Sequence, residues 1–350
     1  MGAPVVLSEW LRWPRSPRYL DPAFSAPGSS GSPVWPYQAA GSAVAGLEVS
    51  DATTDQSSGV VLVSAVVDFG AGEAAGSGMV VDGKDGIVVT NHHVVEGSTT
   101  VTVTDATTGG SYVADVLGTD AQHDVAVLRI EDAPTLAEVT LDTAPLAVGD
   151  LVTAVGDAGG DGGTLTAAAG TVTDTHEPVT VTEDDGTTAT LRNLVEVDAD
   201  IISGDSGGAL LDADGEVVGM NVAASKGTTD ITGYAIPARR VLRIVEAVLS
   251  EVASTDSLGY DPFLGVQLDT TSQGAGAAVA AVLDDGPAQT AGLTAGATIT
   301  ALSGAATPSA DALVREVVGH EPGEVVEVTW TDAAGTSHTA EATLGRAPVA

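Results

Sequence analysis

Cysteine is absent from the 350 residues of this chain, which excludes disulfide bonds and thiolate metal sites but does not assign a compartment. Aromatic residues make up only 3% of the sequence. No run of about 18 apolar residues occurs, so we expect no membrane-spanning helix. No apolar run follows the arginines near the N-terminus, and a conventional secretory signal peptide is therefore not recognisable.

Basic residues are also scarce. The chain holds 12 lysines and arginines against 48 acidic residues, which gives a formal net charge of -36. Binding to nucleic acid needs a basic surface that neutralises phosphates, and docking to anionic lipid has the same requirement. The composition therefore argues against both partners, and the simplest role of the charge is to keep the protein soluble.

Small residues dominate what is present. The sequence is 43% hydrophobic, much of it Ala and Val, and it contains 43 glycines, which favours β-structure over a helical bundle. From about 57 to 238, short runs rich in Val, Ile, Leu and Thr recur every 8–12 residues between turns, a pattern typical of an all-β barrel or sandwich. The predicted strands are Gly59–Val67, Gly78–Asp82, Gly86–Thr90, Thr99–Thr104, Val125–Ile130, Leu151–Gly156, Val195–Val197 and Glu216–Val222.

The hydrophobic period then changes. Pro237–Ala253 has apolar residues at helical spacing, which predicts an amphipathic helix. The sequence therefore divides into four segments. These are an irregular segment over 1–50 that holds six aromatic residues, a β domain over 51–253, a linker over 254–262 and a small α+β module over 263–346. The module is expected to hold strands at Phe263–Leu268, Ala277–Val282, Thr298–Leu302 and Val325–Trp330, with a short helix at Ser309–Val318.

Ser206 stands in a glycine-rich turn, Gly204-Asp205-Ser206-Gly207-Gly208. A serine hydroxyl becomes nucleophilic only beside a base, and it needs donors for the oxyanion that forms. Glycines let the chain turn sharply, so that the Gly204 and Ser206 N–H groups can point at one spot. The same sequence motif fits the nucleophile turn of α/β-hydrolases, including lipases, but in those enzymes the acid and the histidine follow the serine in the chain.

Both partners of Ser206 have candidates upstream of it. Thr90-Asn91-His92-His93-Val94 follows a predicted strand and offers two histidines. Asp124 opens the apolar strand Val125–Leu128, where a buried carboxylate could orient a histidine. The competing acids are Asp115 and Asp120, which we place in a turn-like, solvated stretch.

These segments together resemble the HtrA/Deg-type trypsin-like serine proteases over residues 57 to 346. The matching segments are Gly76–Val80, Thr90–Val94, Asp124–Leu128, Asp198–Leu210, Gly219–Asn221 and Gly233–Pro237. The resemblance implies a mostly β fold with two six-stranded barrels and a triad of His93, Asp124 and Ser206 in the cleft between them. It selects His93 over His92, which would then face away as a surface residue. It also implies an oxyanion hole from the Gly204 and Ser206 amides, with Asp205 N–H assisting.

The C-terminal module resembles a PDZ domain. Phe263-Leu264-Gly265-Val266 fits the loop and strand that capture a C-terminal peptide. Members of the family commonly have an Asp in place of Ala297, and often an Asn in place of Asp205 and a Pro in place of Ala209. The Ala297 departure bears on turn stability more than on peptide binding.

The specificity pocket is expected to involve Asp200 and Asn221. Asp200 lies six residues before Ser206, the offset at which trypsin places an acid at the base of its pocket, so it could select Arg or Lys. The alternative is that Asp200 faces a loop or solvent. Enzymes related to HtrA usually prefer small apolar residues at this subsite.

The predicted function is an ATP-independent serine endopeptidase that cleaves unfolded or misfolded proteins, with C-terminal peptides bound at the PDZ domain. The alternative is a catalytically latent chaperone or adaptor with the same fold. No metal or cofactor is expected, because the histidines are scattered. Members of the family commonly form homotrimers through N-terminal contacts and are secreted or held in the cell envelope, and the aromatic-rich N-terminal segment is compatible with such a trimer.

Overall fold

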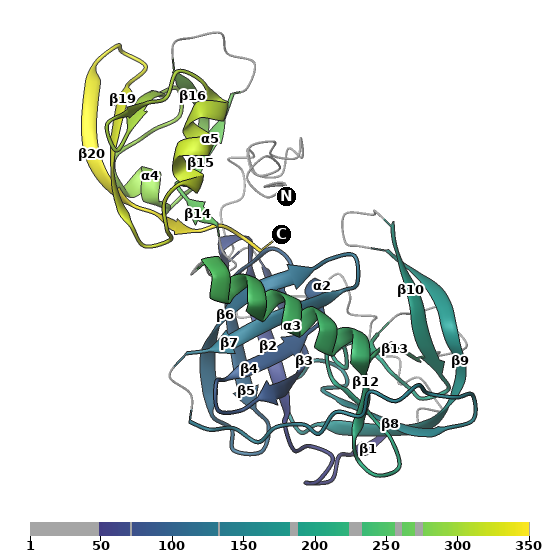
Figure 1. Ribbon diagram of the computed structural model, residues 1–350. Coiled ribbons are helices and arrows are strands. Elements are labelled where there is room, and N and C mark those ends of the chain that lie inside the picture. The colour runs from purple at the N-terminus through teal and green to yellow at the C-terminus, as the bar shows by residue number, and fades with distance from the viewer. Residues whose placement is uncertain are drawn as a thin grey trace, which may run out of the picture.

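The computed structural model describes residues 49–70, 72–131, 134–182, 188–223, 233–255, 261–269 and 276–349. Two β-barrels lie side by side, and a smaller module of strands and short helices follows at the C-terminal end (Figure 1). Most of the predicted irregular segment over 1–50 and the middle of the predicted linker fall outside the described residues.

The first barrel closes in the strand order β2-β3-β4-β7-β6-β5, with every neighbouring pair antiparallel. Its sequences are short and rich in β-branched residues, which fit a pleated, buried surface. The strands are β2 Val60–Val67, β3 Gly72–Asp82, β4 Ile87–Thr90, β5 Ser98–Asp105, β6 Ser111–Asp120 and β7 Val125–Ile130.

The second barrel also has six strands. Its order is β9-β10-β13-β12-β11-β8, the β8–β9 pairing closes the ring, and β1 (Val49–Asp51) adds to β9. The strands are β8 Leu151–Gly156, β9 Thr166–Thr182, β10 Thr188–Val197, β11 Ala209–Leu211, β12 Val217–Val222 and β13 Gly233–Pro237. The predicted double six-stranded barrel is confirmed.

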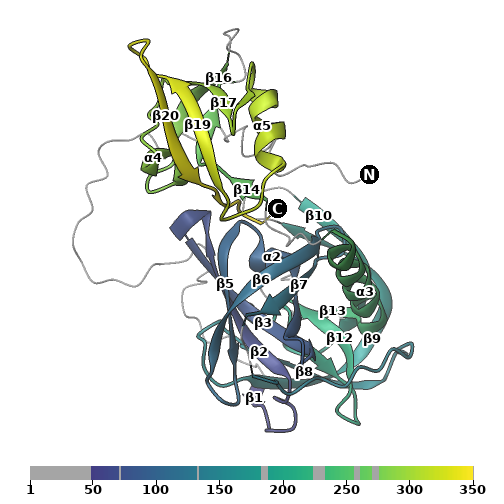
Figure 2. The same ribbon diagram turned by 60° about the vertical axis from the view of Figure 1, so that its left-hand side comes forward.

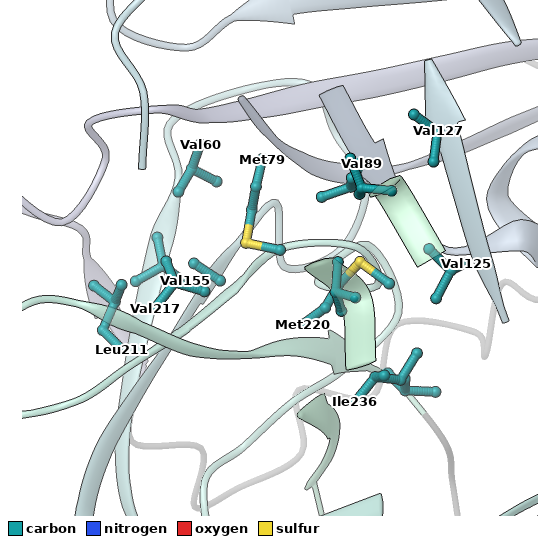
Figure 3. Packing of buried hydrophobic residues seen from close by; sticks show 14 of the residues in the cluster. Val60, Met79, Val89, Val125, Val127, Val155, Leu211, Val217, Met220 and Ile236 are labelled. Atoms are coloured by element: carbon teal, nitrogen blue, oxygen red, sulfur yellow. The ribbon is translucent and has the colours of Figure 1, made fainter. Parts of the chain in front are cut away.

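Alternate residues of a strand serve different cores, which explains why several strands are apolar throughout. In β7, Val125 and Val127 pack in a cluster shared by both barrels, whereas Ala126 and Leu128 pack among residues of the first barrel. Figure 3 shows the shared cluster, in which Val125 and Val127 stand opposite side chains of the second barrel such as Met220 and Ile236. Successive side chains of a strand point to opposite faces, so one apolar run contributes to both clusters.

Helix α3 (Ala238–Thr255) confirms the predicted amphipathic helix. It contacts β12 and β13 of the second barrel as well as β6 and β7 of the first. Its buried Val241 and Val245 belong to the shared cluster. The helix therefore lies across both barrels, as Figure 1 shows, and holds them together.

The C-terminal module is a sheet of order β15-β16-β17-β19-β20 with β18 on β17, and a separate pair β14–β21. Ser309 caps α5 by accepting a hydrogen bond from Ala312 N–H at 3.2 Å. The strands are β14 Pro262–Phe263, β15 Val266–Leu268, β16 Ala277–Val282, β17 Thr298–Leu302, β18 Ala305–Ala306, β19 Val325–Thr331, β20 Ser337–Thr343 and β21 Gly345–Arg346, and the helices are α4 Pro287–Thr290 and α5 Ala310–Val318. Within the described part of the chain, none of the helices combines the length and apolarity needed to cross a membrane.

One local prediction is wrong. The stretch with Asp115 and Asp120 was expected to be turn-like and solvated, but it forms β6, and Asp115 is only 6% exposed. Its acids and Gly118 hide the strand pattern in the sequence. Strand β6 pairs with β5 on one side and β7 on the other. These pairings stabilise the strand although its own residues have weak β propensity.

Candidate active site

His93 lies on α2 (His92–Val95), a single helical turn that follows the fully buried strand β4. Its Nδ1 lies 2.9 and 3.0 Å from the two carboxylate oxygens of Asp124, and its backbone N–H donates to Asp124 Oδ1 at 3.0 Å. An ionised carboxylate can only accept hydrogen bonds, so Nδ1 is the donor and Nε2 is the basic nitrogen. The His93 side chain is 42% exposed, whereas that of Asp124 is 8% exposed.

Asp124 reaches His93 because its backbone turns sharply just before β7. Its φ of 56° lies in the left-handed region, which Asp tolerates better than most side chains. Asn91 Nδ2 donates to the Asp124 carbonyl oxygen at 2.9 Å and holds the turn in place. Of the two competing acids, Asp120 pairs with His123 at 2.8 Å and Asp115 pairs with Arg346.

His92 is not the surface residue that the sequence analysis expected. It is 7% exposed and belongs to the buried face of α2 together with Val94 and Val95. After β4 the chain first reaches the surface at His93, because β4 and the two residues after it are all buried. Neighbouring positions of a helix point about 100° apart, so His92 and His93 face different directions.

Ser206 lies in a loop that presses against strands of both barrels. Gly204 and Gly207 have φ values of 97° and 85°. A Cβ on Gly204 would lie 2.0 Å from the carbonyl oxygen of Asp157, and one on Gly207 would lie 2.1 Å from that of Ser77. Both positions therefore require glycine for conformation and for space. Ser206 Oγ accepts a hydrogen bond from Ala223 N–H at 3.2 Å.

The amides of the nucleophile loop, residues 204–208, divide into engaged and available groups. Asp205 N–H donates to the Ile202 carbonyl at 3.0 Å, and Gly207 N–H donates to the Asn221 carbonyl at 3.0 Å. Among the described residues, no backbone carbonyl accepts from Gly204 N–H or Ser206 N–H. Of the three amides assigned to an oxyanion hole, Gly204 and Ser206 are thus available and Asp205 is engaged.

Ser77 on β3 is a residue whose role sequence reasoning missed. It is fully buried, and its Oγ donates to the Gly204 carbonyl at 2.8 Å while accepting from Asp157 N–H at 2.9 Å. Its own N–H donates to the Ser206 carbonyl at 2.8 Å. The first barrel therefore holds the loop of the second at two points. The Gly76-Ser77-Gly78 match marked this position, but a sequence does not reveal a contact across 127 residues.

The Asp205 carboxyl group is buried, and its Oδ2 accepts from Ile202 N–H at 2.9 Å. Burial raises the pKa of Asp205 to about 7; the Ile202 hydrogen bond opposes this rise, and the nearby Asp157 charge adds to it. The pKa of Asp157 is also raised, chiefly by burial. Two interacting acids with raised pKa values, Asp205 and Asp157, thus lie at the nucleophile loop.

The two residues predicted for the specificity pocket lie in different settings. Asp200 is partly buried between Ala199 and Ile201, which pack inside the second barrel. Asn221 is fully buried, and its Nδ2 donates to the Val155 carbonyl at 3.2 Å and the Ala209 carbonyl at 3.0 Å. Asn221 therefore links β8 and β11, and a role in specificity stays a prediction for both residues.

The peptide-binding loop predicted over Phe263–Val266 joins β14 to β15. Its Leu264 and Gly265 carbonyls accept from Ala288 N–H at 2.9 Å and Leu283 N–H at 3.0 Å. No backbone carbonyl of the described residues accepts from the N–H groups of Leu264 and Gly265. Strand β15 pairs only with β16 in the described sheet and so stands at its edge.

Among the described residues, one group of acids lies close enough together to hold a cation: Asp142, Asp212 and Glu216, each partly buried. The Asp212 carboxylate already accepts from the backbone N–H groups of Asp214 and Glu216, both at 2.9 Å. Turns commonly arrange an acid in this way, so the position of the Asp212 carboxylate is explained without a metal.

Comparison with known proteins identifies related families and structures. Residues 76–220 match the trypsin-like peptidase domain family. Among solved structures, the HtrA-type protease AlgW with a tripeptide is 26% identical with a TM-score of 0.47, and the alignment covers 83% of this chain and 95% of that one.

Two relatives are similar over most of their length. The serine protease PepD of Mycobacterium tuberculosis is 31% identical over 345 residues, which cover 91% of this chain and 71% of the relative. The serine protease Do-like HtrA of Lactococcus lactis is 32% identical over 284 residues, which cover 73% of this chain and 67% of the relative. At this identity and coverage, the chain belongs to the HtrA-type family of trypsin-like serine proteases and is a serine-type endopeptidase.

Proposed function

We propose that the chain cleaves unfolded or misfolded proteins with a triad of Ser206, His93 and Asp124. The contact of His93 Nδ1 with both carboxylate oxygens of Asp124, at 2.9 and 3.0 Å, is the observation that carries this proposal. A half-exposed imidazole held by a buried carboxylate has the tautomer and the access that a general base needs.

In this mechanism Ser206 Oγ attacks the carbonyl carbon of the scissile peptide bond while His93 Nε2 takes the hydroxyl proton. The Gly204 and Ser206 N–H groups stabilise the oxyanion, since both are available for it. His93 then gives its proton to the leaving amine. A water molecule, activated by the same histidine, hydrolyses the acyl-enzyme. Asp124 stabilises the imidazolium throughout.

The C-terminal module is proposed to bind C-terminal peptides as a PDZ domain. The N–H groups of Leu264 and Gly265 would receive the peptide carboxylate, and the free edge of β15 would pair with the peptide strand. Membership of the family also supports a homotrimer and a secreted or cell-envelope location as parts of this proposal.

Replacement of the nucleophile tests the catalytic part. We expect Ser206→Ala to lower the rate of casein cleavage by on the order of 10⁴-fold or more, because the oxyanion donors alone sustain little hydrolysis. The measurement compares wild type and variant on unfolded casein, with cut sites read by mass spectrometry. Cuts after Arg or Lys would support Asp200 as the selecting acid, and cuts after small apolar residues would argue against it.

Two controls make this experiment decisive. Circular dichroism and thermal unfolding must show that Ser206→Ala remains folded, and binding of a C-terminal peptide must be unchanged. Cleavage at the wild-type rate by the folded variant would contradict the assignment of Ser206. No cleavage by either protein, with or without the added peptide, would favour a latent chaperone.

A further inference from the structure

The chain returns from the C-terminal module to the first barrel through a short segment, which we call the strap: residues Ala347, Pro348 and Val349. It follows β21, whose Arg346 pairs with Pro262 of β14. Figure 2 shows the C-terminal end of the chain at the junction between the module and the first barrel. All three residues of the strap are buried.

Val349 is bound to the barrel by a reciprocal pair of backbone hydrogen bonds. Gly97 N–H donates to the Val349 carbonyl at 2.8 Å, and Val349 N–H donates to the Ser98 carbonyl at 2.9 Å. The Val349 side chain is 6% exposed and packs in the core cluster of the first barrel. The paired backbone hydrogen bonds and the buried side chain together dock Val349 on the first barrel.

The docking point is the end of the helix that carries His93. Glu96 N–H closes the single turn of α2 on the His92 carbonyl, and the next amide, Gly97 N–H, donates to Val349. Val94 and Val95 of α2 lie in the same cluster as Val349. One turn of helix has no stability of its own, so its orientation comes from what it packs against.

Further contacts hold the module at the same place. Arg346 Nη1 lies 2.5 Å from Asp115 Oδ1, and its Nη2 lies 3.8 Å from Glu131 Oε1. Asp115 is buried, so the guanidinium compensates a charge that would otherwise be costly there. On the far side of β14, Phe263 stacks on Phe69 of the β2–β3 connection, with ring centroids 4.9 Å apart and planes 24° apart.

We propose that the strap is a positioning element for His93: its docking on Gly97 and Ser98 sets the orientation of α2 and hence the rate of proteolysis. This inference rests on the proposed role of His93 as the base. The C-terminal module would then be joined to the active site directly through Arg346 and the strap, in addition to the linker that precedes it.

The test is Val349→Asp, which places a charge in the apolar cluster and undocks the strap. The matched control is Val325→Asp, the same change at a position of the C-terminal module that is 57% exposed. The assay uses a short peptide substrate, so that binding at the C-terminal module does not contribute. We expect Val349→Asp to lower kcat about tenfold or more with little change in KM, since misplaced catalytic groups lose rate.

The pH profile of kcat/KM separates positioning from loss of folded protein. A change in the His93–Asp124 contact moves the acidic limb of the profile, whereas a smaller folded fraction lowers the whole curve without moving it. Val349→Ile, which keeps an apolar side chain at this position, should have the wild-type kcat and pH profile. A folded Val349→Asp enzyme with wild-type kcat and profile would overturn the proposal.

Arg346→Ala provides a second test should Val349→Asp fail to fold, because it weakens docking from the module side without entering the barrel core. We expect a smaller fall in kcat and a shift of the acidic limb in the same direction, and an unchanged profile would overturn the proposal. His93→Ala and Ser206→Ala test the proposed function separately. If either keeps wild-type activity, the catalytic assignment fails before the strap is considered.

Discussion

Asp205 places a carboxyl group inside the nucleophile loop with only 4% of the residue exposed. Its pKa rises from 3.8 to about 7, mainly through burial. An acid whose pKa is higher in the folded than in the unfolded state binds its proton more tightly when folded. Raising the pH from about 4 to about 7 therefore lowers the contribution of Asp205 to the free energy of unfolding, and this contribution is lost completely above the folded pKa.

Asp205→Asn should remove this pH dependence. The amide oxygen of Asn can still accept from Ile202 N–H, but no buried charge forms. Since one pKa unit corresponds to about 1.4 kcal/mol, we expect the variant to gain up to about 4 kcal/mol over wild type on going from pH 4 to pH 8. Urea unfolding at both pH values measures the difference.

The control for this comparison is Asp214→Asn, which makes the same change of charge at an exposed position. Its stability should follow the wild-type curve. If Asp205→Asn also runs parallel to wild type from pH 4 to pH 8, Asp205 does not titrate as its burial implies.

Some individual residues were predictable from local patterns and others were not. The family resemblance selected His93 and Asp124 as partners, and the structure brings them into contact. The placement of His92 was wrong, because the sequence does not show where a one-turn helix enters the core. The role of Ser77 was missed, because its partners lie far along the chain.

Strand β3 and the nucleophile loop meet at Ser77, so an element of one barrel positions a loop of the other. We expect Ser77→Ala to lower kcat about tenfold or more, because the Gly204 carbonyl loses the donor that holds it and the adjoining amides can reorient. Stability should fall by about 1–3 kcal/mol, the usual cost of leaving buried polar groups unpaired. Steady-state kinetics and urea unfolding measure the two effects.

Thr307→Val is the matched control for the loss of a buried hydroxyl. Thr307 is fully buried, and its Oγ1 donates to the Ile299 carbonyl at 3.2 Å in the C-terminal module. It should lose stability while keeping kcat on a short peptide. Equal kcat values for Ser77→Ala and wild type would show that β3 does not position the loop.

Elements with a strong period were read correctly from the sequence, and elements with a weak one were not. The helix α3 has a regular apolar face, and β7 opens with four apolar residues in a row, so both were predicted close to their observed bounds. Strand β6 contains two acids and a glycine and was taken for a turn. Its strand state depends on β5 and β7, which pair with it on both sides.

The whole molecule carries a formal net charge of -36. Such an excess of negative charge destabilises a compact state, because the charges repel one another. Salt screens this repulsion, with a screening length of about 10 Å at 0.1 M. We therefore expect the melting temperature to rise by several degrees between 10 and 500 mM NaCl. KCl should give the same rise, because screening does not depend on the cation. A flat or falling melting temperature would contradict this account.

The sequence by itself indicated the β-rich class, a β domain followed by a small α+β module, and the residue types of the active site. These features are local, since side-chain period, turn residues and short motifs are written in neighbouring positions. Only the tertiary structure decided which distant groups meet. Ser77 reaches Gly204, Arg346 reaches Asp115 and Val349 reaches Gly97 because closed barrels and a returning strap bring their backbones together. Packing in three dimensions determines such contacts, and no local pattern encodes them.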